Sequence, residues 1–155
     1  MPVVKKLTLQ EQAGSGFTHS IKITSDDLTE TTANTAQTFE VLNVAEGDVV
    51  VIGGYSLVTP FSDASDAAFN DTTVSVGDGS DVDRLLAASQ INENGSEVAT
   101  LVTPNSNDAA PYAYNAADTL DVVVNSMAAK SLSDLDAGEI VILAKVYNLK
   151  DLTVQ

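Results

Sequence analysis

Residues 71–91 read DTTVSVGDGSDVDRLLAASQI, and this segment predicts a β-hairpin. Val74 and Val76 alternate with polar side chains, which is the two-residue period of a half-buried strand. An Asp-Gly dipeptide at 78–79 then favours a tight turn, because both residue types tolerate positive φ. A returning strand is predicted over residues 85–91. The middle of the chain therefore has the pattern of an antiparallel β protein.

The same alternation predicts further strands on both sides of this hairpin. Turn residues separate them, and no helical period is sustained beyond a turn or two. We therefore expect an all-β fold, an antiparallel β-sandwich of about eight strands with a jelly-roll-like arrangement. The predicted strands cover residues 17–24, 37–44, 49–58, 72–76, 85–91, 98–102, 120–125 and 139–147.

Two of these strands, 49–58 and 140–147, are apolar on both faces, so both faces need cover. Adjacent glycines at 53–54 predict a bulge or a close backbone approach. Pro60 lacks a backbone N–H, and the segment 59–61 is therefore expected to end the first of the two strands.

Residues 1–16 are expected to form an N-terminal arm, and residues 17–155 a single β-sandwich domain. The segment Ala13–Gly16 has the composition of a flexible link. Lys5 and Lys6 stand beside apolar residues in this arm, so it is a candidate surface for attachment to a larger partner. A frayed chain end and a strand packed within an oligomer are the alternatives.

The chain has 22 acidic and 7 basic residues, a formal net charge of -15, and no cysteine. Nucleic acid and anionic membrane surfaces are excluded as partners on this charge, because both bind through Lys and Arg. The lack of cysteine removes disulfides and thiolate chemistry. The first residues lack the pattern of a secretory signal, so synthesis in the cytoplasm without Sec export is expected.

A metal site or a pair of catalytic carboxylates would be expected among Asp71, Asp78, Asp81 and Asp83, where acidic side chains gather. Alignment with a calcium-binding loop fails at two positions, since Val82 and Asp83 stand where a ligand and a glycine belong. Ordinary turn aspartates are the preferred interpretation. We predict no catalytic residue, no metal ligand and no cofactor, and hence no enzyme.

Ser15 and His19 are the nearest approach to a hydrolase pair, but they lie in and next to the expected arm and lack the G-x-S-x-G motif. His19 falls on the apolar face of the strand 17–24, so it is expected to be a partly buried, hydrogen-bonded histidine.

Residues 103–117 form the longest stretch without periodicity, and Tyr112 and Tyr114 are its expected exposed contact residues. The two rings are the basis of an alternative function, a carbohydrate-binding β-sandwich of a tail or an adhesin. Sugar sites usually present several aromatic rings, and this chain has few.

Several blocks of the chain resemble small virion proteins of tailed bacteriophages. They are LTETTANTAQT at 28–38, LVTPF at 57–61, TVSVGDG at 73–79, YNAADT at 114–119 and LDAGE at 135–139. The resemblance covers most of the chain after Thr24 and rests on strand and turn patterns. It implies a capsid decoration (cement) or head-fibre protein, typically a homotrimer of β-sandwich or jelly-roll subunits. The implied partner is the major capsid protein, the location is the capsid exterior, and no catalytic residues are implied.

The net charge predicts that moderate salt stabilises the folded chain. Repulsion between carboxylates is screened within a Debye length of roughly 10 Å at 0.1 M salt. The melting temperature measured by calorimetry is expected to rise with added sodium chloride, and melting that does not depend on salt would contradict this.

Overall fold

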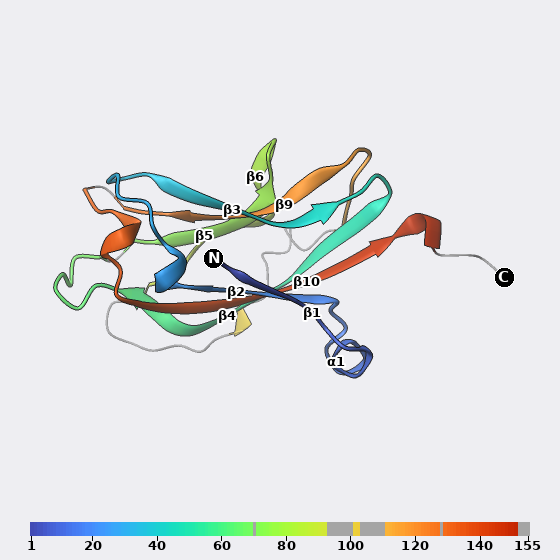
Figure 1. The fold of residues 1–155 in the computed structure, drawn as a ribbon, viewed down its shortest axis with the longest axis horizontal. Helices are drawn as coiled ribbons and strands as arrows, with labels where there is room; N and C mark the ends of the chain where they lie inside the picture. Colours follow the sequence, from blue (N-terminus) through green and yellow to red (C-terminus); the bar gives the residue numbers. More distant parts are fainter. Residues whose placement is uncertain (70, 93–100, 103–110, 128, 152–155) are drawn as a thin grey trace.

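The fold is a sandwich of two antiparallel β-sheets (Figure 1). The structure is a computed structural model that describes residues 1–69, 71–92, 111–127 and 129–151, together with the backbone of residues 101–102. The predicted antiparallel β-sandwich is confirmed. Its strands are β1 Val3–Lys6, β2 His19–Thr24, β3 Ala36–Val44, β4 Asp48–Ser62, β5 Thr73–Asp78, β6 Asp81–Gln90, β7 Leu101–Val102, β8 Tyr112–Ala113, β9 Asp118–Asn125 and β10 Ala137–Asn148.

The helical elements are short. They are the α-helix α1 Leu9–Ser15 and the single 3₁₀ turns η1 Ser25–Asp27, η2 Leu132–Asp134 and η3 Leu149–Asp151. None of the helices in the described ranges has the length and the apolar character needed to cross a membrane.

The strand order is that of a jelly roll. The first sheet, called sheet A, runs β1-β2-β10-β4-β7, and β8 also pairs with β4. The second, called sheet B, runs β3-β9-β5-β6. When β2 is counted as the first strand, and β1 and β8 are left aside, sheet A holds strands one, eight, three and six. Sheet B holds strands two, seven, four and five, which completes the double Greek-key arrangement of eight strands.

Apolar side chains from both sheets fill the space between them. Alternate residues of each strand point inward, as in Val122 and Val124 of β9, which are fully buried. The largest side chains that are almost wholly buried include Phe61, Ile21, Ile23, Ile52, Leu85, Ile91, Leu120, Leu132, Ile140 and Ile142. This single core joins both sheets and all the long strands.

The two strands predicted to be apolar on both faces pair with each other. β4 and β10 run antiparallel from Ala137 opposite Ser62 to Asn148 opposite Asp48. The register shifts between Leu143 and Ala144, opposite the glycine pair, which confirms the predicted bulge. A side chain at Gly53 would overlap the ring of Phe17, so the close backbone approach is confirmed as well.

The sequence predicted that β4 ends at Pro60, and this prediction is wrong. The strand continues to Ser62. The register between β4 and β10 shifts on both sides of Glu139, and Pro60 has no ladder partner there. Its missing N–H therefore costs no hydrogen bond. Gly138, at φ +150, lies in the same irregular stretch, and its Cα faces the ring of Phe61.

Residues 1–16 are more regular than the expected arm. β1 adds a strand to the edge of sheet A through pairing with β2. In α1 the Thr8 hydroxyl accepts from the backbone N–H of Glu11, whose carboxylate accepts from the N–H of Thr8, a capping box. Gly16 ends the helix with φ +79. Residues 98–100 of the strand predicted over 98–102 lie outside the described residues.

Gly77 lies where the first strand of the predicted hairpin, β5, comes very close to the backbone of the second, β6. A methyl group there would overlap the backbone carbonyl of Asp81 and the backbone of Val82. Gly77→Ala is expected to lower the free energy of unfolding by about 1–3 kcal/mol, because backbone atoms have to move. The measurement is equilibrium unfolding in urea.

The matched control is Gly14→Ala in α1, where nothing lies within 4 Å of the added methyl group. Alanine is favoured over glycine in a helix by about 0.5–1 kcal/mol, so this variant is expected to match or exceed the parent. Equal unfolding midpoints for the two variants would contradict the close approach at Gly77.

Candidate functional site

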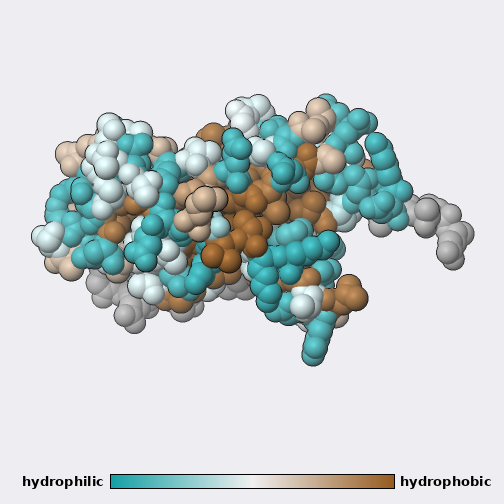
Figure 2. Space-filling view, viewed as in Figure 1, coloured by the Kyte–Doolittle hydropathy of each residue, from teal (hydrophilic) through white to brown (hydrophobic). Residues whose placement is uncertain are grey.

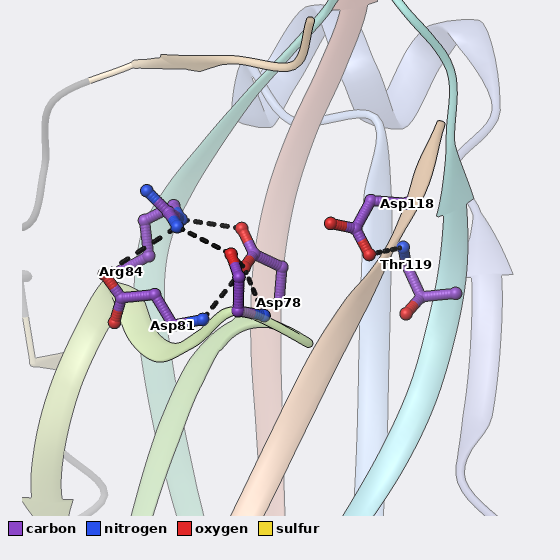
Figure 3. Close-up of polar contacts among 6 residues, drawn as sticks. Asp78, Asp81, Arg84, Asp118 and Thr119 are labelled. Atoms are coloured by element: carbon purple, nitrogen blue, oxygen red, sulfur yellow. Dashed lines mark hydrogen bonds and ion pairs between the residues drawn. The ribbon is translucent and has the colours of Figure 1, made fainter. Parts of the chain in front are cut away.

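The turn between β5 and β6 is organised around the carboxylate of Asp78 (Figure 3). Asp78 is only 1% exposed. Its Oδ1 accepts from the backbone N–H of Ser80 at 3.0 Å, from the Ser80 hydroxyl at 2.7 Å and from the N–H of Asp81 at 3.0 Å. Its Oδ2 accepts from Nε of Arg84 at 2.6 Å. Both oxygens are thus occupied by donors of the hairpin itself.

These contacts decide the charge of Asp78. Burial raises the pKa of this carboxyl, but the hydrogen bonds from Ser80 and Arg84 outweigh it and hold the pKa below its usual range. Arg84 also donates to the Ser80 hydroxyl at 3.0 Å and lies 3.9 Å from the carboxylate of Asp81. The turn therefore contains a charged carboxylate whose hydrogen bonds stabilise the turn itself.

Tyr112 and Tyr114 are not the exposed pair that the sequence predicted. The guanidinium of Arg84 lies over the ring of Tyr112, 4.3 Å from its centroid. The ring of Tyr114 meets that of Tyr112 edge to face at 4.9 Å. Tyr114 itself is 5% exposed, because β8 and the residue after it pair with the start of β4. The observation behind a sugar-stacking platform is therefore absent.

The hydroxyl of Tyr114 is buried without a hydrogen-bond partner. Burial, with the nearby carboxylates of Asp78 and Asp118, raises the pKa of this phenol above its usual range. Asp118 approaches the hairpin from β9, where it accepts from the N–H of Thr119 at 2.8 Å (Figure 3).

Asp121 is the second buried carboxyl at this end of sheet B. It lies on β9, opposite Gly77 of β5 and Glu40 of β3. Asp121 is 5% exposed, and its Oδ1 has no hydrogen-bond partner. Burial raises the pKa of Asp121 and outweighs an opposing hydrogen bond from Thr119. The charges of Glu40, Asp118 and Asp78 raise this pKa further.

The acidic residues singled out in the sequence thus have different places. Asp78 and Asp81 belong to the turn, and Asp83 follows in β6, whereas Asp71 is exposed beyond the opposite end of β5. Asp118 and Asp121 complete the acidic group and were not predicted. Among the described residues, no three or more His, Cys, Asp or Glu side chains are placed to hold a metal ion.

The Ser15 and His19 pair is held by other contacts. The hydroxyl of Ser15 donates to the carbonyl of Glu11 at 2.7 Å, inside α1. Nδ1 of His19 lies 2.8 Å from the hydroxyl of Thr18. Partial burial, with the charge of Lys6, lowers the pKa of His19, in agreement with the partly buried histidine that was predicted.

An apolar groove opens between the two sheets at the edge formed by β1 and β3. Its volume is about 400 Å³. Figure 2 shows hydrophobic surface gathered in the middle of this face, between polar borders. The groove is lined by Met1, Pro2, Val4, Thr38, Phe39, Glu40 and Val41.

The groove is open because each sheet ends there. β1 is the last strand of sheet A and β3 the last of sheet B, and no described strand pairs with their outer edges. The chain start is fixed at this place by the terminal ammonium of Met1, which pairs with Asp27 at 2.5 Å. The composition of the first residues predicted a contact surface there. The part played by Phe39 and Val41 could not be predicted, because the sequence of a strand does not reveal its position in a sheet.

Comparison of the chain with protein-family models, with curated proteins and with solved structures gives no match.

Asp121→Asn is expected to stabilise the protein at neutral pH. The pKa of Asp121 is higher in the folded chain than in the unfolded chain, so stability falls as the pH rises through this interval. The variant removes the buried charge and can donate to a neighbouring carboxylate. We expect its melting temperature to exceed the parent's by roughly 2–4 °C at pH 7, the effect of about 1 kcal/mol in a domain of this size.

Asp78→Asn is the matched control with the opposite sign. The pKa of Asp78 is lowered by folding, so its contribution is present at pH 7 and is lost as the pH falls from the unfolded pKa of about 3.9 through the lower folded pKa. This variant is expected to melt below the parent at pH 7, by an amount that shrinks in acid. Differences that do not change between pH 7 and pH 3 would contradict both assignments.

Proposed function

We propose that this protein is a virion structural protein, a capsid decoration (cement) protein that binds the outer surface of a phage head and stabilises it. The observation that carries the proposal is the apolar groove between two free strand edges. Exposed apolar surface beside unpaired backbone groups favours association with other chains, and native proteins usually cover or blunt such edges. The proposed partners are the major capsid protein and further copies of the chain, in a homotrimer on the capsid exterior.

The jelly roll is compatible with this role but does not establish it. Viral capsid proteins and lectins both use this architecture, and one fold hosts many functions. The resemblance of the strand and turn blocks to tailed-phage virion proteins is the second support. This resemblance favours a structural role, and it implies no catalytic residue.

The charge distribution supports assembly from a soluble precursor. A net charge of -15 keeps copies apart in solution and opposes binding to nucleic acid. Association then has to come from a local surface where apolar contact or opposite charge outweighs the general repulsion. The groove edge is the described surface with both features, since it is apolar and lies beside Lys5 and Lys6 of β1.

The alternative, a carbohydrate-binding module, loses the pair of tyrosines on which it rested. Tyr112 is covered on one face by Arg84, and Tyr114 is buried. No other observation on the described residues favours this class.

The proposal predicts that the chain is a component of purified virions of the phage that encodes it, detected by mass spectrometry. Heads of that phage lacking the chain should bind the purified protein in cosedimentation. Bound heads should rupture at a higher temperature than bare heads, because a ligand that binds only the intact assembly stabilises it.

Two valine variants locate the binding surface. Val41→Asp places a charge in the groove and is expected to weaken head binding about tenfold or more. Val82→Asp is the control, because Val82 is 49% exposed on β6 and does not line the groove. Absence of the chain from virions, or heads whose rupture temperature does not change on adding the protein, would overturn the proposal.

A further inference from the structure

The two strands that border the groove carry opposite charges. β1 has the sequence VVKK, so it carries Lys5 and Lys6 and no acid. β3 has the sequence AQTFEVLNV, so it carries Glu40 and no base. Each strand is the last of its sheet, and each has one backbone edge that no described strand pairs with. One face of the molecule thus presents a basic and an acidic free edge side by side.

The charges on these edges are only partly neutralised within the chain. Lys5 pairs with Glu11 at 2.5 Å, but both side chains are about half exposed to solvent. Lys6 and Glu40 are in no ion pair among the described residues. Both are exposed. Each is therefore available to a partner of opposite charge.

Between the edges lies apolar surface that water contacts. Val4 on one side and Phe39 and Val41 on the other pack against the core but keep part of their surface open to the groove. Figure 2 shows this surface as a continuous hydrophobic area on the same face. A strand laid along either edge would satisfy backbone groups and cover these side chains at once.

We propose that the β1 edge of one copy of this chain pairs with the β3 edge of a second copy, a head-to-tail contact that can repeat around the proposed homotrimer. Like edges are disfavoured as partners. A contact of β3 with β3 brings two Glu40 side chains together, and a contact of β1 with β1 brings lysines together. Only the pairing of a β1 edge with a β3 edge, called the crossed pairing, sets Lys6 against Glu40.

The proposed partner is a second copy because the chain itself has both a basic edge and an acidic edge. Copies with a net charge of -15 repel each other, so their contact requires a place where opposite charges meet. β1 is the described strand that offers two lysines without an acid at a free edge. This contact uses only self-association and does not depend on binding to a phage head.

Charge reversal on the full-length chain tests the crossed pairing. Glu40→Lys and Lys6→Glu are each expected to raise the dissociation constant of self-association about tenfold or more, because each sets like charges together. The double variant Lys6→Glu with Glu40→Lys restores opposite charges and is expected to return most of the lost affinity. Light scattering and sedimentation equilibrium over a concentration series measure these constants.

Asp71→Lys is the control for net charge. It makes the same change of charge as Glu40→Lys, and Asp71 is exposed before β5, outside β1 and β3. It should self-associate as the parent does or slightly more tightly. Circular dichroism checks that each variant is folded, and Glu40→Gln with Lys6→Gln replace any variant that is not.

Amide hydrogen exchange of the unmodified protein gives an independent test. Amides of Ala36–Val44 and Val3–Lys6 should exchange more slowly at high protein concentration than at low concentration, as paired edges do. A parent protein that stays monomeric at hundreds of micromolar would overturn the proposal. So would a double variant no better than its worse single parent, which is the result expected for like-edge pairing or for a surface elsewhere.

Discussion

The antiparallel pairing of β4 with β10 is the constraint on which the rest of the fold depends. These are the two longest strands, and they occupy the middle of sheet A, with β2 on one side and β7 and β8 on the other. Their inner faces carry Ile52, Ile140 and Ile142 into the core against sheet B. Because the strands are far apart in sequence, this pairing closes the jelly roll.

Irregularities along this pair adapt two long strands to a curved sandwich. Bulges bend a strand and increase its local twist, which a strand of fifteen residues needs if it is to stay in one sheet. One irregularity accommodates Phe17 over Gly53, and the other accommodates Phe61 beside Gly138. The same stretch lets Pro60 remain inside β4. Local sequence rules treat proline as a stop signal, and they fail here because the partner strand decides whether its N–H is needed.

Strand positions were predictable from the sequence, whereas edges were not. Alternation of apolar residues marks a strand wherever one face is buried, and this located β2, β3, β4, β5, β6, β9 and β10. The capping box of Thr8 and Glu11 was also readable in the sequence and would have indicated α1. β1 and the groove were missed because they depend on which strands end each sheet. That property arises from pairings between distant residues.

In the candidate site, too, contacts between neighbours in sequence were predictable, whereas contacts between distant residues were not. The turn role of Asp78 could be predicted from the Asp-Gly signal, because its partners Ser80 and Asp81 are neighbours in sequence. The burial of Asp121 and Tyr114 could not, because it depends on pairing with distant strands, β3 and β5 for Asp121 and the start of β4 for Tyr114. Two carboxyls at the same end of sheet B therefore have pKa values shifted in opposite directions. One has several hydrogen-bond donors, and the other has an oxygen with none.

Helix α1 leaves this architecture room for variation. It has no buried residue, and its ends are closed by its own capping contacts, so the core does not depend on its surface side chains. The helix lies between two strands that are already joined by their ladder, and exposed connections of this kind accept inserted residues. A peptide epitope or an affinity tag placed within this loop would be displayed beyond the end of β1 while the sandwich behind it stays unchanged (Figure 1).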